Sequence, residues 1–150
     1  MSQALANLLV HIVFSTKQRQ NYLTPDICLR LYPYINKILK NQGCYPYQIG
    51  GMPDHIHILC GLAKTVCISK LIEEIKTSTS KWIKTKDIDF SNFYWQSGYG
   101  AFSVSSSRLN VVQSYIANQT KHHEKSTFQQ EFLGLLNKHR IVYDKRYLWD

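Results

Sequence analysis

Residues 45–62 read YPYQIGGMPDHIHILCGL, and this stretch predicts a β-hairpin. Two strand-like runs, Tyr45–Gly50 and His55–Leu62, lie on either side of residues 51–54. That joint, GMPD, combines the glycine, proline and aspartate that favour tight turns. We therefore expect the two runs to pair as neighbouring antiparallel strands.

The second strand of this hairpin has two different faces, because residues two apart in a strand point the same way. One face is apolar and typical of packing on helices, and it carries Ile56, Ile58, Cys60 and Leu62. The opposite face carries His55 and His57, whose Cβ atoms would be about 7 Å apart. Two neutral imidazoles at that spacing can bind one divalent cation. An isolated His-x-His pair is more often hydrogen-bonded without a metal, so a metal site needs support from a second element.

The segments outside the hairpin extend the pattern to an α+β fold. Apolar or alternating runs predict strands at residues 5–14 and 99–105. Helical periodicity predicts helices at 25–42, 65–86, 108–121 and 128–139, of which the first contains Pro33 and so could kink or start later. The order βαββαβ followed by helices predicts a ferredoxin-like or RRM-like antiparallel sheet with two helices on one face. All of residues 1–150 are expected to form a single domain.

The composition limits the class of partner. The chain of 150 residues has 18 Lys and Arg against 10 Asp and Glu, a formal charge of +8 that suits nucleic acid but is also common in other basic proteins. No apolar run approaches the roughly 20 residues that a membrane span needs, and the start lacks the pattern of a signal peptide. The four cysteines form no CxxC pair, so we expect buried free thiols in a reducing cytoplasm.

A second candidate group lies on the helix predicted at residues 108–121. Tyr115 and Gln119 are four residues apart, so they lie on one side of that helix, at the edge of its apolar stripe. A tyrosine in this place is commonly a half-buried packing residue with its hydroxyl in water. Its functional interpretation is a phenol nucleophile with an amide oxygen one helical turn away.

These residues resemble the single-tyrosine transposases of the IS200/IS605 type, which are members of the HUH endonuclease superfamily. The resemblance rests on His-Ile-His at 55–57, followed about 60 residues later by Tyr-x-x-x-Gln at 115–119. Further segments agree in the same order: FSTKQR at 14–19, GMPDHIHIL at 51–59, WQSGYGAFSVSSS at 95–107 and YDKRYLW at 143–149. The resemblance covers nearly the whole chain.

The resemblance implies that His55, His57 and Gln119 hold a Mg²⁺ or Mn²⁺ ion and that Tyr115 is the catalytic nucleophile. The implied enzyme cleaves and rejoins single-stranded DNA at hairpin-marked element ends through a 5′-phosphotyrosine intermediate. It would be cytoplasmic, and nucleoid-associated when bound to DNA. The resemblance also implies a homodimer, in which the tyrosine helix of one subunit completes the histidine pair of the other. No nucleotide cofactor is expected, because the chain lacks a GxxxxGK[ST] phosphate loop.

Basic side chains are candidates for contacts with the DNA backbone. They lie after the first strand, along the second helix and at the start of the tyrosine-bearing helix, and they are Lys17, Arg19, Lys76, Lys81, Lys84 and Arg108. For any one of them an ordinary solvated position is the simpler interpretation.

Other polar residues have simpler interpretations too. We expect His122 and His123 to be exposed at a helix end, although they could donate to phosphate or assist proton transfer. Asp54 is expected to form the turn rather than to support a metal-bound histidine, and His11 to be a core or interface histidine. The sequence does not identify a base that would activate Tyr115.

Two other functions are compatible with the same fold. A non-catalytic RRM-like module would bind single-stranded nucleic acid through aromatic residues on the sheet, but the strand at 55–62 offers no such aromatic pattern. A domesticated HUH nickase would cut DNA without moving an element. A covalent protein–DNA adduct, and its rejoining to a second strand, would discriminate among the three.

Overall fold

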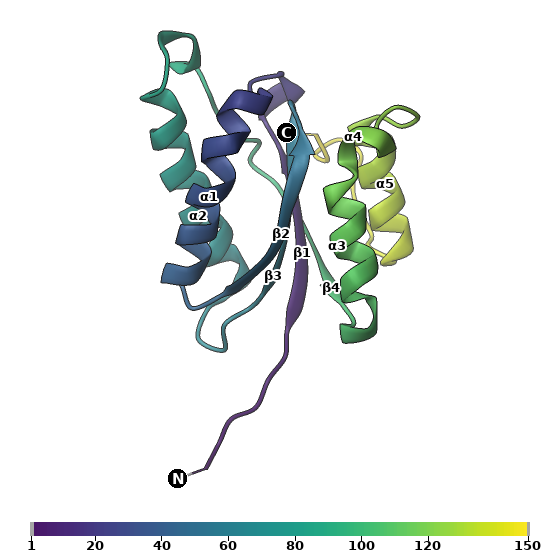
Figure 1. The fold of residues 1–150 in the computed structure, drawn as a ribbon. Helices are drawn as coiled ribbons and strands as arrows, with labels where there is room; N and C mark the ends of the chain where they lie inside the picture. Colours follow the sequence, from purple (N-terminus) through teal and green to yellow (C-terminus); the bar gives the residue numbers. More distant parts are fainter. Residues whose placement is uncertain (1, 150) are drawn as a thin grey trace.

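Among residues 2–149, which the computed structural model describes, four strands form one antiparallel sheet (Figure 1). They are β1 (Leu9–Ser15), β2 (Tyr45–Met52), β3 (His55–Gly61) and β4 (Gly100–Val104). Their order, β2-β3-β1-β4, places β1 and β3 in the centre, as in a ferredoxin-like sheet. The predicted fold class and hairpin are therefore confirmed, and the register sets His57 of β3 opposite Val13 of β1.

Helices cover both faces of this sheet (Figure 1). On one face lie α1 (Pro25–Asn41) and α2 (Ile68–Lys84), and on the other lie α3 (Leu109–Ala117), α4 (Gln119–His122) and α5 (Phe128–Lys138). Short 3₁₀ turns occupy Lys17–Arg19, Ile88–Phe90 and Ser106–Arg108. Within residues 2–149 the structure has no helix that is both long enough and apolar enough to span a membrane.

The main core lies between the sheet and the pair α1 and α2. Ile12 of β1 and Ile56 and Ile58 of β3 are fully buried there, so the predicted apolar face of the hairpin is confirmed. They pack with apolar residues of the two helices, including Leu31 and Ile75. Burial of a side chain of this size contributes about 1.5–3 kcal/mol. This core fixes β3, and with it the side chains that point to the opposite face.

Two glycines let helices approach that opposite face closely. A Cβ atom at Gly50 of β2 would overlap the backbone carbonyl of Ile116, so α3 lies directly on the strand at this point. A Cβ atom at Gly100 of β4 would lie 2.7 Å from Cε1 of Phe132, which is where α5 packs on the sheet. Any larger residue at Gly50 or Gly100 would crowd α3 or α5, since packed interiors tolerate little added volume.

The helix predicted at residues 108–121 is interrupted. Asn118 leaves the helical conformation (φ −102°, ψ 26°), and it separates α3 from α4. Asparagine is a poor residue for a helix interior, because its side chain competes for backbone hydrogen bonds. The first helix, by contrast, begins at Pro25 and runs through Pro33 without a break.

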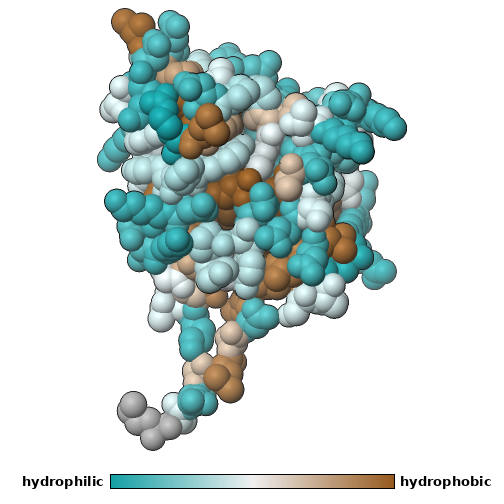
Figure 2. Space-filling view, viewed as in Figure 1, coloured by the Kyte–Doolittle hydropathy of each residue, from teal (hydrophilic) through white to brown (hydrophobic). Residues whose placement is uncertain are grey.

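The strand predicted at residues 5–14 starts only at Leu9. Its neighbours β3 and β4 end opposite that residue, at Gly61 and Val104, so the preceding residues have no strand to pair with. Residues 2–8 instead extend away from the sheet (Figure 1). Figure 2 shows hydrophobic side chains along this segment, in agreement with the high exposure of Leu5 and Leu8.

The prediction of buried thiols is only partly right. Cys44 and Cys60 are buried and Cys28 is partly buried, but Cys67 is exposed. Cys67 is the N-cap residue of α2.

Candidate functional site

The two histidines of β3 are buried on the face covered by α3, α4 and α5. His55 and His57 have no exposed surface, and their ring centres lie 5.2 Å apart. The strand period that buries Ile56 in the main core directs both imidazoles to this opposite face. The predicted side-by-side placement of the pair is thus present.

A carboxylate from α5 lies against both histidines. Oε1 of Glu131 is 2.9 Å from Nε2 of His57 and 3.3 Å from Nε2 of His55, and its side chain is 1% exposed. A capping box fixes the start of this helix, since the Thr127 hydroxyl accepts from the Gln130 N–H and the Gln130 amide accepts from the Thr127 N–H. Glu131 follows in the first turn, and its position is therefore set by a well-defined helix end.

His123 completes a compact group of possible metal ligands. Its Nε2 lies 3.1 Å from Oε1 of Glu131, and its Nδ1 lies 2.7 Å from the carbonyl of Ser126. One ligand atom from each of His55, His57, His123 and Glu131 lies within 4.8 Å of the others. The expectation that His123 is exposed at a helix end is wrong, because the turn after α4 folds its ring under α5. His122 is partly exposed, as expected.

Gln119, the predicted third ligand, is buried beside this group. Its Oε1 lies 3.1 Å from Nε2 of His55, and its Nε2 donates to Oε2 of Glu131 at 2.9 Å. The same Oε1 lies 2.9 Å from Nε2 of His123. Gln119 therefore contacts three of the four possible ligands.

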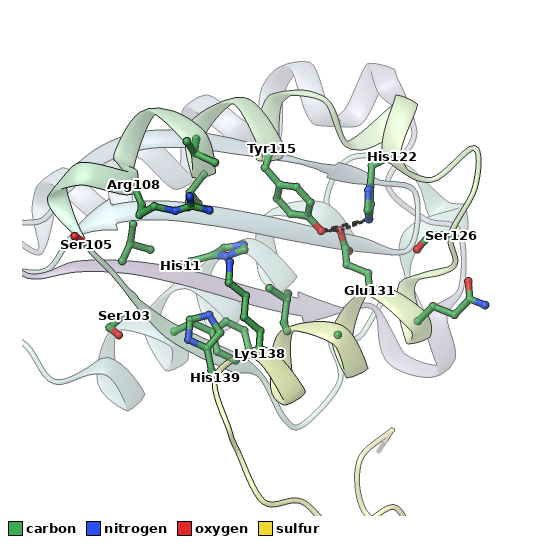
Figure 3. Close-up of a pocket in the computed structure, with 17 residues that line it drawn as sticks. His11, Ser103, Ser105, Arg108, Tyr115, His122, Ser126, Glu131, Lys138 and His139 are labelled. Carbon is green, nitrogen blue, oxygen red and sulfur yellow. Dashed lines mark hydrogen bonds and ion pairs between the residues drawn. The ribbon is translucent and has the colours of Figure 1, made fainter.

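Tyr115 reaches the group within the same chain (Figure 3). Its hydroxyl donates to Oε2 of Glu131, and it lies 3.4 Å from Nε2 of His122. Its ring centre is 5.9 Å from that of His57. Glu131 thus presents one oxygen to the histidines and the other to the phenol.

The Nδ1 atoms of His55 and His57 each have a hydrogen-bond partner. Oδ1 of Asp54 is 2.7 Å from Nδ1 of His55, so Asp54 does more than form the turn, which corrects the expectation from the sequence. Nε2 of His11 is 2.8 Å from Nδ1 of His57. Burial lowers the pKa of His11 to about 3, so this ring is neutral and can accept from His57. Both arrangements direct Nε2 of the β3 histidines into the group.

The electrostatics of the group follow from burial and from these hydrogen bonds. Burial alone would lower the pKa of His55, but hydrogen bonds with Asp54 and Glu131 outweigh it and raise the pKa to about 9. Burial lowers the pKa of His57. Burial opposes ionisation of Glu131, yet its histidine partners hold its pKa well below the usual range. Burial and the neighbouring Glu131 carboxylate raise the pKa of Tyr115. With this arrangement the phenol is protonated at neutral pH.

The donor set fits a divalent cation. Three imidazole nitrogens and one carboxylate oxygen converge. Imidazole and carboxylate side chains are both common ligands of divalent metals in proteins. Two histidines and Gln119 alone would supply no negative charge. Glu131 supplies one negative charge, so the site should bind a cation more strongly than the ligand set predicted from the sequence.

Of the six predicted DNA contacts, Arg108 is on the same face of the sheet as Tyr115. It lines a cavity that also includes Tyr115 and Glu131 (Figure 3). Lys76 is turned inward on α2, where its ammonium donates to the carbonyls of Gln96 and Gly98, each at 2.8 Å. Burial lowers the pKa of Lys76 to about 8.

The other four basic residues do not line that cavity. The ammonium groups of Lys17 and Lys84 both approach the ring of Tyr94, at 5.7 and 4.1 Å from its centre. Arg19 lies over Trp149, and Lys81 is exposed in the last turn of α2. Because α2 covers the opposite face of the sheet, its lysines do not join Arg108.

Sequence reasoning missed Glu131 and His123. The helix predicted at 128–139 did carry a signal, because Glu131 lies on the apolar stripe between Phe128 and Phe132. A carboxylate that faces a core requires a buried partner. His123 gave no comparable signal, since its burial depends on the turn after α4.

The chain is similar to known transposases. The family model described as "Transposase IS200 like" matches residues 4–119. The ISDra2 transposase TnpA of Deinococcus radiodurans is 22% identical over 114 residues, which cover 73% of this chain and 81% of that protein.

Two solved structures share the fold. One is described as a transposase from Deinococcus radiodurans R1, with a TM-score of 0.62 and 22% identity over 79% of this chain and 98% of that chain. The other is a REP-associated tyrosine transposase bound to a REP hairpin, with a TM-score of 0.59 and 17% identity over 82% of this chain and 74% of that chain.

The family match covers more than half of the chain. It contains His55, His57, Tyr115 and Gln119, whereas His123 and Glu131 lie beyond its end. The chain therefore belongs to the IS200-like transposase family, and it is a tyrosine transposase of the IS200/IS605 type.

Proposed function

We propose that this transposase cleaves and rejoins single-stranded DNA at hairpin-marked ends, with Tyr115 as the nucleophile and a divalent cation held by His55, His57, His123 and Glu131. The observation that carries the proposal is the hydrogen bond from the Tyr115 phenol to Glu131, the carboxylate that also contacts both β3 histidines. Nucleophile and cation site thus share one side chain.

Glu131 is proposed to position the nucleophile, because it accepts the hydrogen bond from the phenol. The raised pKa of Tyr115 keeps the phenol protonated, so its proton must leave as the oxygen attacks. Oε2 of Glu131 accepts the hydrogen bond from that phenol. Gln119 donates to the same oxygen and holds it in place.

A divalent cation bound at the four residues would polarise the scissile phosphate and stabilise the charge of the transition state. Asp54 and His11 orient the two β3 histidines through their Nδ1 atoms. Gln119 is proposed as an additional ligand, because its Oε1 points at Nε2 of His55.

The proposed step exchanges one ester for another. The phenolic oxygen of Tyr115 forms a bond to phosphorus while the bond from phosphorus to the 3′ oxygen breaks. The products are a 5′-phosphotyrosine and a free 3′-OH, which takes up one proton. Attack by the 3′-OH of another strand reverses the step and restores the phenol, so rejoining needs no nucleotide cofactor.

The chemistry of the chain and of its relatives supports a hairpin substrate. The related REP-associated transposase is bound to a REP hairpin, and this chain carries a formal charge of +8. Such a substrate implies a cytoplasmic enzyme that is nucleoid-associated when bound to DNA. A non-catalytic RRM-like module would need an open sheet face, but here α3, α4 and α5 cover that face.

The homodimer implied by the resemblance remains a prediction. Within this chain the Tyr115 hydroxyl already reaches Glu131, which contacts His57, and this supports a site completed by one subunit. Light scattering of the protein with and without hairpin DNA would measure its mass. A complementation assay would test a shared site, because a mixture of Tyr115→Phe and His57→Ala proteins regains activity only if subunits exchange the tyrosine helix.

The reaction is tested with single-stranded hairpin DNA from the ends of the protein's own element, labelled at its 5′ or 3′ end. With Mn²⁺, wild type should form a denaturation-resistant adduct that carries the 3′ label. Tyr115→Phe should form none. Tyr147→Phe is the matched control and should behave as wild type, because Tyr147 is exposed and distant in sequence from Tyr115.

Each contrary result has a defined meaning. An adduct formed by Tyr115→Phe would overturn the nucleophile, and undiminished cleavage by His57→Ala would overturn the cation site. A non-catalytic binder would form no adduct with any variant. A nickase would form the adduct but would not rejoin it to an added strand with a free 3′-OH.

A further inference from the structure

A cavity of about 510 Å³ lies next to Tyr115, between β4, α3 and α5 (Figure 3). Tyr115 and Glu131 form one end of it, and Arg108 lies toward the other end. The cavity is therefore continuous with the candidate site but extends beyond it, along the length of α3.

The walls of this cavity suit a flat, partly apolar ligand. His139 stacks on the buried ring of Phe102, with ring centres 4.7 Å apart and planes at 25°, and its own partly exposed ring lines the cavity. Val111 and Val112 of α3 and Leu135 of α5 add aliphatic surface. Such walls match the faces of a nucleobase, because stacking on aromatic side chains and apolar contact stabilise bases that have left a helix.

The charges at the cavity suit a phosphate. Arg108 stands at the start of α3 and Lys138 at the end of α5, and both are exposed. Small-molecule sites usually measure about 300–1,000 Å³, and the cavity lies within this range. It is enclosed by a strand and two helices, so it can hold one nucleotide but not a duplex.

We propose that this cavity binds one unpaired nucleotide of single-stranded DNA, with its base against the ring of His139 and a phosphate at Arg108 and Lys138. The proposal rests on the proposed function in one respect, since the other phosphate of that nucleotide is then the scissile one at Tyr115. Only a nucleotide whose base is free to leave its stack can enter. The cavity thereby selects unpaired DNA at the point of cleavage.

Gly134 provides a way to fill the cavity without disturbing the site. It lies on the lining, and a Cβ atom there would meet no heavy atom within 4 Å. Gly134→Phe therefore places a ring in the cavity and also removes a helix-interior glycine, which favours folding. Gly134→Ala is the matched control, because it makes the same backbone change and leaves the space open. Gly134→Leu serves as a second filling variant if Gly134→Phe does not fold.

The test measures the affinity of the full-length protein for fluorescein-labelled dT8 in EDTA, which prevents cleavage. Gly134→Phe should weaken binding at least about fivefold relative to Gly134→Ala, the lower end of the effect of one stacked base. An octamer of abasic residues keeps the phosphates but lacks bases. It should bind Gly134→Phe and Gly134→Ala equally. Arg108→Gln should weaken the binding of both probes by the same factor. It should also reduce the slope of log affinity against log salt concentration by about one.

Three results would overturn the proposal. Equal affinity of Gly134→Phe and Gly134→Ala for dT8 would show that no base enters. An equal loss for dT8 and the abasic octamer would show that the ring only blocks the backbone. Self-association that Gly134→Phe abolishes, with dT8 binding unchanged, would assign the cavity to a second copy of the chain.

The outcome is separable from that of the proposed function. If the nucleotide cavity is wrong, Gly134→Phe will still form the Tyr115 adduct as Gly134→Ala does. If the proposed chemistry is wrong, no adduct forms with any variant, yet the difference between dT8 and the abasic probe persists.

Discussion

Replacement of Glu131 by glutamine should weaken both the metal site and the fold. The carboxylate accepts from Gln119 and from the Tyr115 phenol on one oxygen, and it contacts His57 and His123 with the other. An amide of the same shape has one acceptor oxygen, so at least one of these buried donors loses its partner. That loss costs about 1–3 kcal/mol.

The effect on metal binding comes in addition to this loss. Loss of even a supporting partner of a metal ligand reduces affinity by about 10–100-fold, so loss of a direct ligand should cost at least about 100-fold. At a Mn²⁺ concentration of about 100 times the wild-type Kd, the metal stabilises wild type by about 2.7 kcal/mol. At the same concentration it would stabilise Glu131→Gln by only about 0.4 kcal/mol.

Urea unfolding with and without Mn²⁺ measures both quantities, and calorimetry measures the affinity directly. Glu124→Gln is the control, because it removes the same charge from an exposed residue near α5. If Glu131→Gln gains as much stability from Mn²⁺ as Glu124→Gln does, Glu131 is not a ligand and the reasoning fails.

Three further predictions concern folding. Gly50→Ala should displace α3, lower the free energy of unfolding by about 1–3 kcal/mol and reduce adduct formation. Gly61→Ala is the control and should have none of these effects, because a Cβ atom there makes only ordinary contacts. Similar unfolding curves for the two variants would contradict the prediction. Since the folded pKa of His55 is raised to about 9, the metal-free protein should lose stability from pH 6.5 to 9 in urea unfolding, and Asp54→Asn should flatten that dependence. Lys76→Met should lower the free energy of unfolding by about 1–2 kcal/mol, because the carbonyls of Gln96 and Gly98 lose their hydrogen-bond donor. Unchanged stability together with weaker DNA binding would instead support the prediction that Lys76 contacts DNA.

The part of the site that lies on regular elements could be predicted from the sequence. His55 and His57 share a face because a strand has a period of two, and this period holds in the structure. Tyr115 and Gln119 were linked by helical spacing, and both do contact one group, although Asn118 breaks the helix between them. The break changes the direction of the chain without separating the two side chains.

The residues that could not be predicted depend on tertiary contacts. Glu131 reaches the histidines because α5 packs back on β4 at Gly100, and no local pattern states where a helix will dock. His123 is buried only because that docking covers it. For Asp54 the sequence supported two roles, and the observed bond to His55 shows that a turn residue can also orient a ligand.

The position of Glu131 has a consequence for the C-terminal part of the chain. His57 and Glu131 are 74 residues apart, and they meet across the junction of sheet and helix. A cation bound to both would act as a removable cross-link that closes this long loop, comparable in its effect on chain entropy to a disulfide. Chelation should therefore loosen the docking of α5 first. Hydrogen exchange of the α5 amides would then report metal loading without any measurement on DNA.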